Sequence, residues 1–346
     1  MDSTKKKIFL TGESGTIAKA IDFYANRYNC VVVNNQDNFA TLKHHKGFEC
    51  REPEVDILGK NTLDRIFNTV AIDYVVHAAA FVGSDFCDLR PNNAIDVNIQ
   101  GTLNIVELCN KYNIPIIYLS TTAIFDPRDY TSENPITENT RINPQTLYGI
   151  TKYAGELIIR NQCKSSYLIL RPVFGFGNFP DDLHSALTKV IYTVYENIFR
   201  KTGKLNVLLG RCIKKSYTRV ENFANCILKI VDDIDLDGLT TRCLNMGEHY
   251  IDSSYNWENL FEIISNVLVV KHSFNKQLIK DIFYSRVYFI SEQDYLHTHV
   301  IDNYLLRRFV GDFNKIPNYI SLEQGIEMTV ESVMRNANKV KPYWLE

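Results

Sequence analysis

The sequence predicts an α/β protein built on a doubly wound parallel β-sheet, with a smaller C-terminal lobe. Three observations lead to this fold class. Short apolar runs alternate with helical patterns through the first half of the 346-residue chain, a glycine-rich turn directly follows the first run, and the second half changes in texture. Because parallel strands need crossover connections, the alternation favours right-handed β-α-β units that bury both faces of one sheet.

The predicted elements follow one another in order along the first half of the chain. Apolar runs bounded by turn residues predict buried strands at residues 8–11, 31–33, 74–80, 114–120 and 167–170. Apolar side chains at helical spacing predict helices between them, at residues 17–24, 63–70, 94–112 and 148–159.

The glycine-rich turn, TGESGTIA at residues 11–18, has the pattern of a dinucleotide-binding loop. Gly12 permits a tight turn, Gly15 lets the backbone approach a pyrophosphate, and Ala18 is small enough for the helix to pack on the sheet. Glycines also serve ordinary turns, but the strand–turn–helix context and the helix N-terminus favour a phosphate-bearing cofactor. The residues expected to contact it here are Gly12, Ser14, Gly15, Thr16 and Ile17.

The texture of the sequence changes after Pro172, where turn-forming residues lead into short mixed segments rich in Tyr, Asn and Asp. We therefore predict a dinucleotide-binding domain over residues 1–172. Residues 173–346 are expected to form mostly a substrate-binding lobe, with segments that return to the first domain.

The composition bears on partners and location. The chain has 38 Lys and Arg against 40 Asp and Glu, so its net charge of −2 favours neither nucleic acid nor an anionic membrane as a partner. Its eight cysteines are scattered, without a C-x-x-C pair or a Cys/His cluster of zinc spacing, which is typical of a reduced protein without a metal site. Without a signal-peptide pattern or an apolar stretch of about 20 residues, the expected location is the cytoplasm.

Two further features point to chemistry. Tyr148 and Lys152 are four residues apart in a predicted helix, so they share one face, and a nearby cation makes a tyrosine a usable proton donor or acceptor. Ser120, Thr121 and Thr122 end a buried strand, at the edge where open α/β sheets bind ligands. Each feature alone is also consistent with an exposed helix or a capped strand, but together with the glycine loop they favour an active site.

These residues resemble the extended short-chain dehydrogenase/reductase family, the NAD-dependent epimerase/dehydratase group of nucleotide-sugar enzymes. The resemblance covers nearly the whole chain. It rests on TGESGTIA with Ala18 in place of the last glycine, Asp56-Ile57, HAAA at residues 77–80, NIQGT at residues 98–102, Asn143-Pro144, YGITK at residues 148–152 and Arg171-Pro172.

The resemblance implies a Rossmann domain and a role for each matching residue. It makes Tyr148 the catalytic acid/base, Lys152 its cationic partner that also bonds the nicotinamide ribose, and Thr121 the group that binds the reacting oxygen. The implied cofactor contacts outside the glycine loop are Asn34, Asp56, Ile57, Ala78, Ala79, Ala80, Asn98, Tyr148 and Lys152. The implied substrate contacts are Val82, Thr122, Asn178, His184, Arg211 and Lys215.

Departures from the family's patterns narrow the reaction. In 4,6-dehydratases Asp-Glu follows the catalytic Thr, whereas Thr122-Ala123 stands here, and the cysteine acid/base of GDP-fucose synthases near Ala123 is missing as well. Without that cysteine, His184 is more consistent with a surface or structural histidine than with a second acid/base. The segments STTAIFD and NPQTLYGITKYAGE are most similar to dTDP-4-dehydrorhamnose reductases.

We therefore expect a nucleotide-sugar 4-keto reductase. Two alternatives stay open, a nucleotide-sugar 4-epimerase on the same Thr/Tyr/Lys apparatus and a non-catalytic dinucleotide-binding regulatory protein. The intact set of Thr121, Tyr148 and Lys152 argues against the second alternative, because a protein that only binds has no need of it.

The expected cofactor is NADP or NAD, with a slight preference for NADP. An acidic residue at the end of the second strand would bond the ribose hydroxyls of NAD, but neutral amides, among them Asn34, stand there without an arginine. The substrate implied is a nucleotide-diphosphate sugar, with its diphosphate near Lys215 or Arg211, although both are also consistent with solvated charges. The family's dimers pack the helices equivalent to residues 94–112 and 148–159 against their two-fold mates, so we expect a homodimer.

Overall fold

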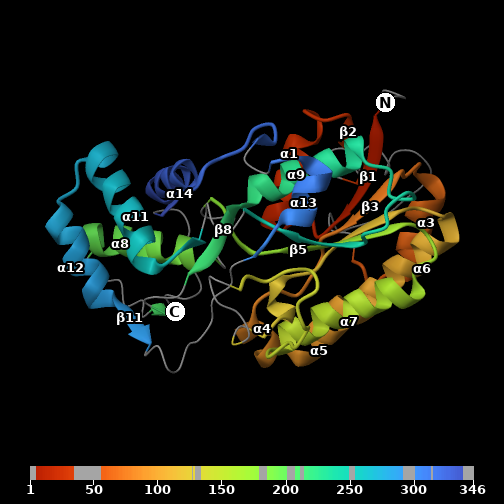
Figure 1. Ribbon diagram of the computed structural model, residues 1–346, viewed down its shortest axis with the longest axis horizontal. Coiled ribbons are helices and arrows are strands. Elements are labelled where there is room, and N and C mark those ends of the chain that lie inside the picture. The colour runs from red at the N-terminus through yellow and green to blue at the C-terminus, as the bar shows by residue number, and fades with distance from the viewer. Residues whose placement is uncertain are drawn as a thin grey trace.

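The fold is an α/β domain on a six-stranded parallel sheet, with a smaller lobe at one end (Figure 1). A computed structural model describes residues 5–34, 56–126, 128, 134–178, 185–200, 207–210, 214–248, 254–290, 301–312 and 315–337. The strands are β1 (Lys6–Thr11), β2 (Cys30–Val32), β3 (Tyr74–His77), β4 (Ile116–Leu119), β5 (Tyr167–Pro172) and β9 (Cys243–Met246), in the order β2-β1-β3-β4-β5-β9. This arrangement confirms the predicted fold class.

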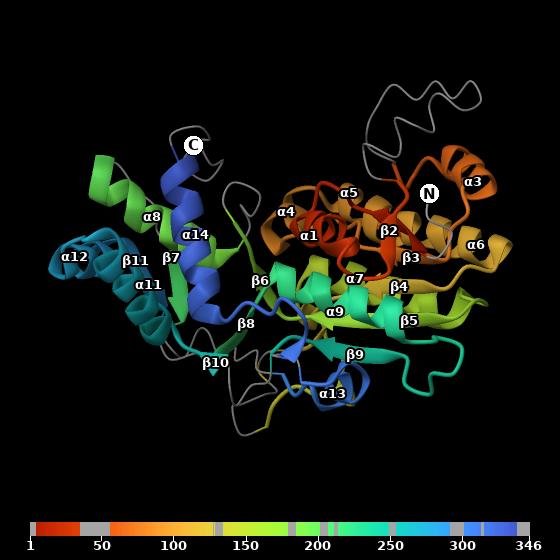
Figure 2. The same ribbon diagram turned by 90° about the horizontal axis from the view of Figure 1, so that it is seen from above.

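Helices cover both faces of this sheet, and each face has its own apolar core. Strand β1 shows why, because Ile8 and Leu10 face one core, Phe9 faces the other, and all three are buried. On one face α1 (Thr16–Ala25) packs against α9 (Val220–Asp233), with α13 (Tyr304–Val310) beside α9 and β9 (Figures 1 and 2). The other face carries α3 (Lys60–Thr69), α6 (Thr102–Tyr112) and α7 (Leu147–Gln162).

The strand order places a switch point between β1 and β3. From β1 the chain moves outward to β2 and then crosses back to β3 on the other side of β1. Connections therefore leave in opposite directions at the carboxyl ends of β1 and β3, and open α/β sheets bind their ligands in the crevice that results. The turn after Thr11 and the turn after His77 meet at this edge.

One predicted helix is interrupted. Residues 94–112 do not form a single α-helix, because α5 (Pro91–Ile95) runs into a π-helical segment, η1 (Asp96–Gly101), before α6 begins. Such wide turns are frequent at functional sites. This one carries Asn98, whose side chain bonds both the loop after β3 and helix α7.

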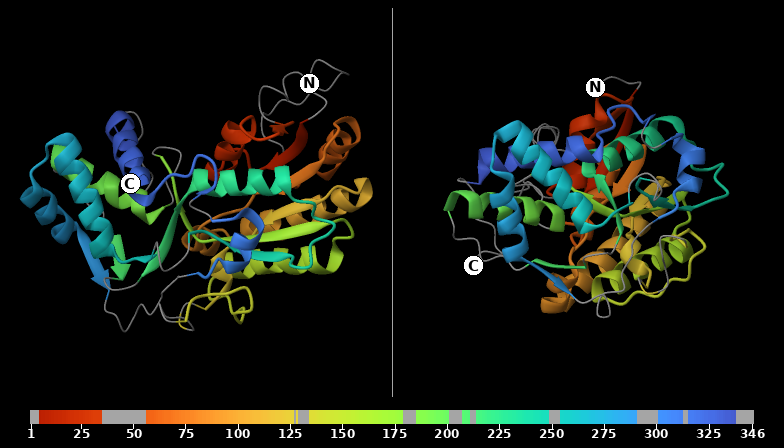
Figure 3. Two further views of the ribbon diagram at one scale, coloured as in Figure 1. Left: turned by 45° about the horizontal axis from the view of Figure 1, so that its top comes forward. Right: turned by 60° about the vertical axis from the view of Figure 1, so that its left-hand side comes forward.

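The lobe has a core separate from those of the sheet. Its helices α8 (Ala186–Arg200), α11 (Trp257–His272), α12 (Lys276–Arg286) and α14 (Leu322–Asn336) pack on one another, at the end opposite α3 and α6 (Figure 3). Strands β6 (Phe174–Phe176), β8 (Lys215–Arg219) and β10 (Ser254–Tyr255) form a small sheet, and β7 (Val207–Gly210) pairs with β11 (Val287–Ile290). Strands β6 and β8 lie between the lobe and the large sheet (Figure 2).

The described residues contain neither a membrane-spanning helix nor a cluster of metal-binding side chains. None of the helices found there combines the length and apolar character that a membrane span requires. No group of three or more His, Cys, Asp or Glu side chains in the same residues could hold a metal ion.

Candidate active site

The glycine loop lies against the turn that follows β3. Gly12 has a φ of +76°, and a Cβ there would lie 2.7 Å from the Ala79 Cα, so only glycine fits this backbone-to-backbone contact. Gly15 precedes α1, and no described side chain caps this helix. The amide groups of its first turn are thus available to an anion. The cradle fits the pyrophosphate of a dinucleotide, and the contacts of Ser14, Thr16 and Ile17 with it stay predictions.

A buried histidine fixes the geometry of this edge. The Thr11 hydroxyl accepts a hydrogen bond from the Ala79 N–H at 3.0 Å, so it donates its own proton to His77 Nδ1 at 2.7 Å. His77 Nε2 then donates to the Thr102 hydroxyl at 3.1 Å, which in turn donates to the Asn98 carbonyl at 2.7 Å. The bonding pattern therefore requires a neutral His77 with its proton on Nε2.

Asn98 ties the turn after β3 to helix α7. Its Oδ1 accepts from the Phe81 N–H at 2.7 Å, and its Nδ2 donates to the Phe81 carbonyl at 3.1 Å and to the Thr151 hydroxyl at 2.9 Å. All three bonds go to the protein, so the side chain holds the backbone around Ala78 and Ala80 in place at the cofactor edge. Its own contact with a cofactor stays a prediction.

Asn34 is buried and bonds to the strand beside it. Its amide bonds the N–H and the carbonyl of Leu10 at 2.8 and 2.7 Å and donates to the Glu13 carboxylate at 2.7 Å. The side chain thus anchors the end of β2 to β1 and to the glycine loop. Asp56 is exposed and bonds the N–H of its own turn, and Ile57 is buried in the core behind it.

Thr121 and Tyr148 are brought together at the end of β4. The Thr121 hydroxyl accepts from the Ala123 N–H at 3.1 Å, and the same hydroxyl lowers the pKa of the neighbouring Tyr148 phenol. Tyr148 stands in the first turn of α7, whose N-terminus is capped by Thr146. A Cβ on Gly149 would collide with the Ala123 carbonyl oxygen, so a glycine here lets the helix approach the turn that carries Thr121.

Lys152 lies one helical turn beyond Tyr148 and is only 2% exposed. Its Nζ stands 4.3 Å from the centre of the Tyr118 ring, a cation–π contact. Burial lowers the pKa of Lys152 to about 7, although the Glu156 carboxylate acts in the opposite direction. Burial and the Lys152 charge lower the pKa of His77 to about 3, which agrees with its neutral state.

Burial also sets the ionisation of Tyr148. It raises the pKa of Tyr148 to about 12, although the neighbouring Thr121 hydroxyl acts in the opposite direction. In the protein without ligands the phenol is therefore protonated at neutral pH, the form that a proton donor needs.

Sequence reasoning missed a buried ion pair beneath these groups. Glu156 accepts from the Ser120 hydroxyl at 2.6 Å and from Arg171 Nε and Nη2 at 2.8 and 2.7 Å. Glu156 and Arg171 have fully buried side chains. A signal was present, because a glutamate four residues after Lys152 faces the core together with that lysine, and charged residues are rarely buried unpaired.

The predicted substrate contacts are spread over two regions. Val82 is exposed after β3, whereas Thr122 is buried and donates to the Pro172 carbonyl at 3.4 Å. In the lobe, Lys215 Nζ stands 4.5 Å from the centre of the Phe174 ring, and burial lowers the pKa of Lys215 to about 8.

Of the three remaining substrate candidates, the structure describes Asn178 alone. Asn178, at the end of β6, accepts from Arg219 Nη2 at 3.3 Å. His184 and Arg211 lie outside the described residues. The substrate roles of this group stay predictions.

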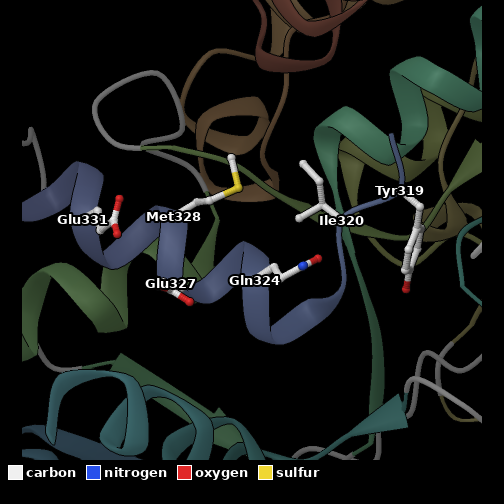
Figure 4. A pocket seen from close by; sticks show the side chains of 6 residues that line it. All are labelled: Tyr319, Ile320, Gln324, Glu327, Met328 and Glu331. Carbon is white, nitrogen blue, oxygen red and sulfur yellow. The ribbon is translucent and has the colours of Figure 1, made fainter. Parts of the chain in front are cut away.

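A hollow on the lobe lies along α14 and contains none of the predicted site residues (Figure 4). It is lined by Tyr319, Ile320, Gln324, Glu327, Met328 and Glu331. Glu327 pairs with Lys271 at 3.1 Å. The chemistry-bearing groups therefore lie elsewhere, at the carboxyl edge of the large sheet.

Comparison with known proteins identifies a family. The family model described as the RmlD substrate binding domain matches residues 6–241. The chain is 31% identical over 158 residues to a putative UDP-glucose 4-epimerase from Methanocaldococcus jannaschii, covering 44% of this chain and 50% of that protein. It is 27% identical over 137 residues to a dTDP-4-dehydrorhamnose reductase from Aggregatibacter actinomycetemcomitans, covering 40% of this chain and 45% of that protein. These matches span about half the length of each relative.

A solved structure resembles the whole fold. The structure of RMD from Pseudomonas aeruginosa complexed with NADPH superposes with a TM-score of 0.71 at 13% identity, covering 96% of this chain and 100% of that one. At this identity the likeness shows the fold alone.

Proposed function

The chain belongs to the RmlD substrate binding domain family, and from that premise we propose that it is an NAD(P)-dependent oxidoreductase that reduces a 4-keto nucleotide sugar. The observation that carries the proposal is the convergence of Thr121, Tyr148 and a buried Lys152 where α7 meets the turn after β4, at the same sheet edge as the glycine cradle. A proton donor, an oxygen-binding hydroxyl and a dinucleotide cradle are the parts that carbonyl reduction needs.

Each side chain has a distinct task in the proposed reaction. Thr121 and Tyr148 bond the substrate carbonyl oxygen and stabilise the negative charge that develops on it. Tyr148 then donates its phenolic proton to that oxygen. Lys152 bonds the nicotinamide ribose and orients it toward the substrate. When bound, the reduced nicotinamide supplies the hydride.

The cofactor and the substrate class are supported by the relatives. RMD was solved with NADPH, which supports NADP(H). We propose NADP(H) as the preferred cofactor and a nucleotide-diphosphate sugar as the substrate. Lys215, beside the Phe174 ring between the lobe and the sheet, is the proposed diphosphate contact.

A 4-epimerase is the second candidate, because one of the matched relatives is a putative UDP-glucose 4-epimerase. The two reactions use the same Thr121, Tyr148 and Lys152. They differ in the cofactor cycle, since an epimerase regenerates its cofactor in each turnover. Denaturing the purified protein and identifying the released nucleotide separates them, with retained NAD favouring the epimerase.

We also propose a cytoplasmic homodimer. Apolar side chains are exposed on α4 (Ser84–Leu89), α5 and α7, namely Leu89, Ile95, Ile150 and Leu157. These helices neighbour one another on one side of the sheet domain (Figure 1). Contiguous exposed apolar surface is typical of an interface between protein chains. The cytoplasmic location is supported by thiols that stay free in the described residues, Cys30, Cys87, Cys109, Cys163, Cys226 and Cys243.

The reductase is tested by offering 4-keto and 4-hydroxy nucleotide sugars separately and following the absorbance of NADPH. We expect one NADPH to be consumed for each ketone reduced. Interconversion of 4-hydroxy epimers without net change in the cofactor would show the epimerase instead.

A further inference from the structure

We infer that Glu156 is a positioning residue of the proposed active site, whose buried carboxylate keeps Lys152 charged and holds the end of β4 against α7. The inference rests on the proposed function. It concerns a group that touches neither the predicted substrate oxygen nor the predicted cofactor, and that acts through Lys152 and Thr121.

The position of Glu156 on α7 gives the first argument. It lies four residues after Lys152, and side chains at this spacing are neighbours on one helix face. Both side chains are buried against the sheet. A buried ammonium is costly without an opposite charge, and Glu156 is the group whose field favours the charged form of Lys152.

The bonds of Glu156 give the second argument. Ser120 directly precedes Thr121 at the end of β4, and Arg171 stands at the end of the neighbouring strand β5. Glu156 bonds both, at 2.6 Å to the Ser120 hydroxyl and at 2.7 and 2.8 Å to the Arg171 guanidinium. One carboxylate thus joins α7, which carries Tyr148, to the strand end that carries Thr121.

The other titratable groups around the pair do not replace this charge. Facing Lys152 are His77 on β3, which is neutral, and Tyr118 on β4, whose pKa is raised by burial. Glu156 is faced by Tyr118 and Arg171, and by Arg160 of α7, which is more distant at 3.4 Å. Cys243 on β9 also faces it, and burial raises the pKa of that thiol to about 12. Glu138 lies beyond Arg171. Among these groups, Glu156 is the anion next to Lys152.

A purely structural role is the alternative. A buried Glu–Arg pair can simply join two elements, and apolar residues of similar size often do this as well or better. A structural role predicts that removing the charge changes stability only. A positioning role predicts that it also changes the pH at which Lys152 loses its proton.

The test follows NADPH binding by fluorescence from about pH 5 to about pH 9, a range that covers the titration of a lysine with a lowered pKa and a further downward shift of it. The protonated lysine favours the anionic dinucleotide, so affinity is full below the pKa of Lys152 and falls as the pH rises through it. In Glu156→Gln, Lys152 loses its anion and faces an unbalanced Arg171. We expect the midpoint of this loss to move down by roughly one pH unit, which weakens binding up to about tenfold near neutral pH.

The matched control is Glu107→Gln, the same change in the exposed pair that Glu107 of α6 forms with Lys60 of α3, which should leave the midpoint unchanged. Because Glu156→Gln strands a buried arginine, the double variant Glu156→Met/Arg171→Met serves if the single variant does not fold, and it should move the midpoint in the same direction.

A folded variant with the wild-type midpoint would overturn the inference and leave the proposed function intact. Failure of the wild-type protein to bind NADPH would contradict the proposed cofactor and the inference together. Melting temperatures of all variants separate loss of stability from the shift in pH dependence.

Discussion

At the scale of single residues, burial governs the chemistry of the proposed site. It raises the pKa of Tyr148 to about 12 and lowers the pKa of Lys152 to about 7, so that the phenol keeps its proton and the lysine titrates near neutral pH. Thr121 and Glu156 act against these two shifts through a hydrogen bond and a charge. Changes at either group should therefore alter the ionisation of the site, and changes at Glu156 also break its buried pair with Arg171.

Replacing Tyr148 by Phe removes the phenolic oxygen and keeps the ring. Proton transfer from a positioned group typically contributes about 10²–10⁴-fold, so we expect kcat to fall by that order. Cofactor affinity should stay near the wild-type value, because the proposed ribose contact of Lys152 is kept. Steady-state kinetics and NADPH titration measure the two quantities, and a variant that keeps wild-type kcat would exclude Tyr148 as the proton donor.

Lys215 gives a prediction for substrate binding. Burial lowers its pKa to about 8, so the side chain is charged below that pH and becomes neutral above it. We expect KM for a nucleotide sugar to rise as the pH increases through about 8, and Lys215→Met to show a raised KM with this pH dependence removed. The control is Lys271→Met, which removes an exposed lobe lysine paired with Glu327. An unchanged KM in Lys215→Met would remove this lysine from the diphosphate site.

Sequence reasoning could propose residues that belong to local motifs, but it could not find the Glu156–Arg171 pair. Tyr148 and Lys152 are separated by one helical turn, so their spacing alone indicates a shared face. Glu156 and Arg171 belong to different elements, and their pairing depends on how α7 lies across β5. Likewise, Asn34 follows its strand as expected, but only the fold shows its bonds to Leu10 and Glu13.

At the scale of elements, close approaches between backbones position the site. The predicted strand at residues 74–80 ends at His77, because the following turn leaves the ladder to meet Gly12. The predicted helix at residues 148–159 is longer, Leu147–Gln162. The π-helical turn within the predicted helix at residues 94–112 could not be predicted from the sequence. The spacing of apolar residues does not indicate that Asn98 bonds to other elements.

Gly149→Ala tests the contact between α7 and the turn after β4. A Cβ there collides with the Ala123 carbonyl oxygen, which is backbone and cannot swing aside. We expect a loss of about 1–3 kcal/mol in the free energy of unfolding, typical of overpacking. We also expect kcat to fall, because Tyr148 moves away from Thr121. Gly238→Ala is the matched control, because nothing lies within 4 Å of its Cβ position. Equal effects of the two substitutions on kcat would contradict this account of how the helix is positioned.

At the scale of the whole molecule, two parts meet at the edge where the proposed site lies. Sequence patterns predicted the parallel sheet, because buried strands are continuous apolar runs. The lobe could be expected only from composition, since its short strands pair across long sequence separations, as β8 (Lys215–Arg219) does with β6 (Phe174–Phe176).

The homodimer is a prediction at this scale. We expect the mass of a dimer in solution at micromolar concentration. The double variant Ile150→Glu/Leu157→Glu places charges on the exposed face of α7 and should shift the mass toward the monomer. Val270→Glu, on an exposed position of α11 in the lobe, should leave the mass unchanged. A monomeric wild-type protein would contradict the proposed homodimer.

The most direct test of the account follows the hydride itself. The protein is supplied with NADPH carrying deuterium at the transferable C4 position, together with a 4-keto nucleotide sugar, and the product is analysed by mass spectrometry and NMR. A reductase that uses Thr121, Tyr148 and Lys152 as proposed should place one deuterium at C4 of the sugar for each cofactor oxidised. In Tyr148→Phe the rate at which deuterium enters the sugar should fall together with kcat. A sugar product without deuterium, or 4-hydroxy epimers that interconvert while the labelled NADPH stays intact, would contradict the proposed reduction.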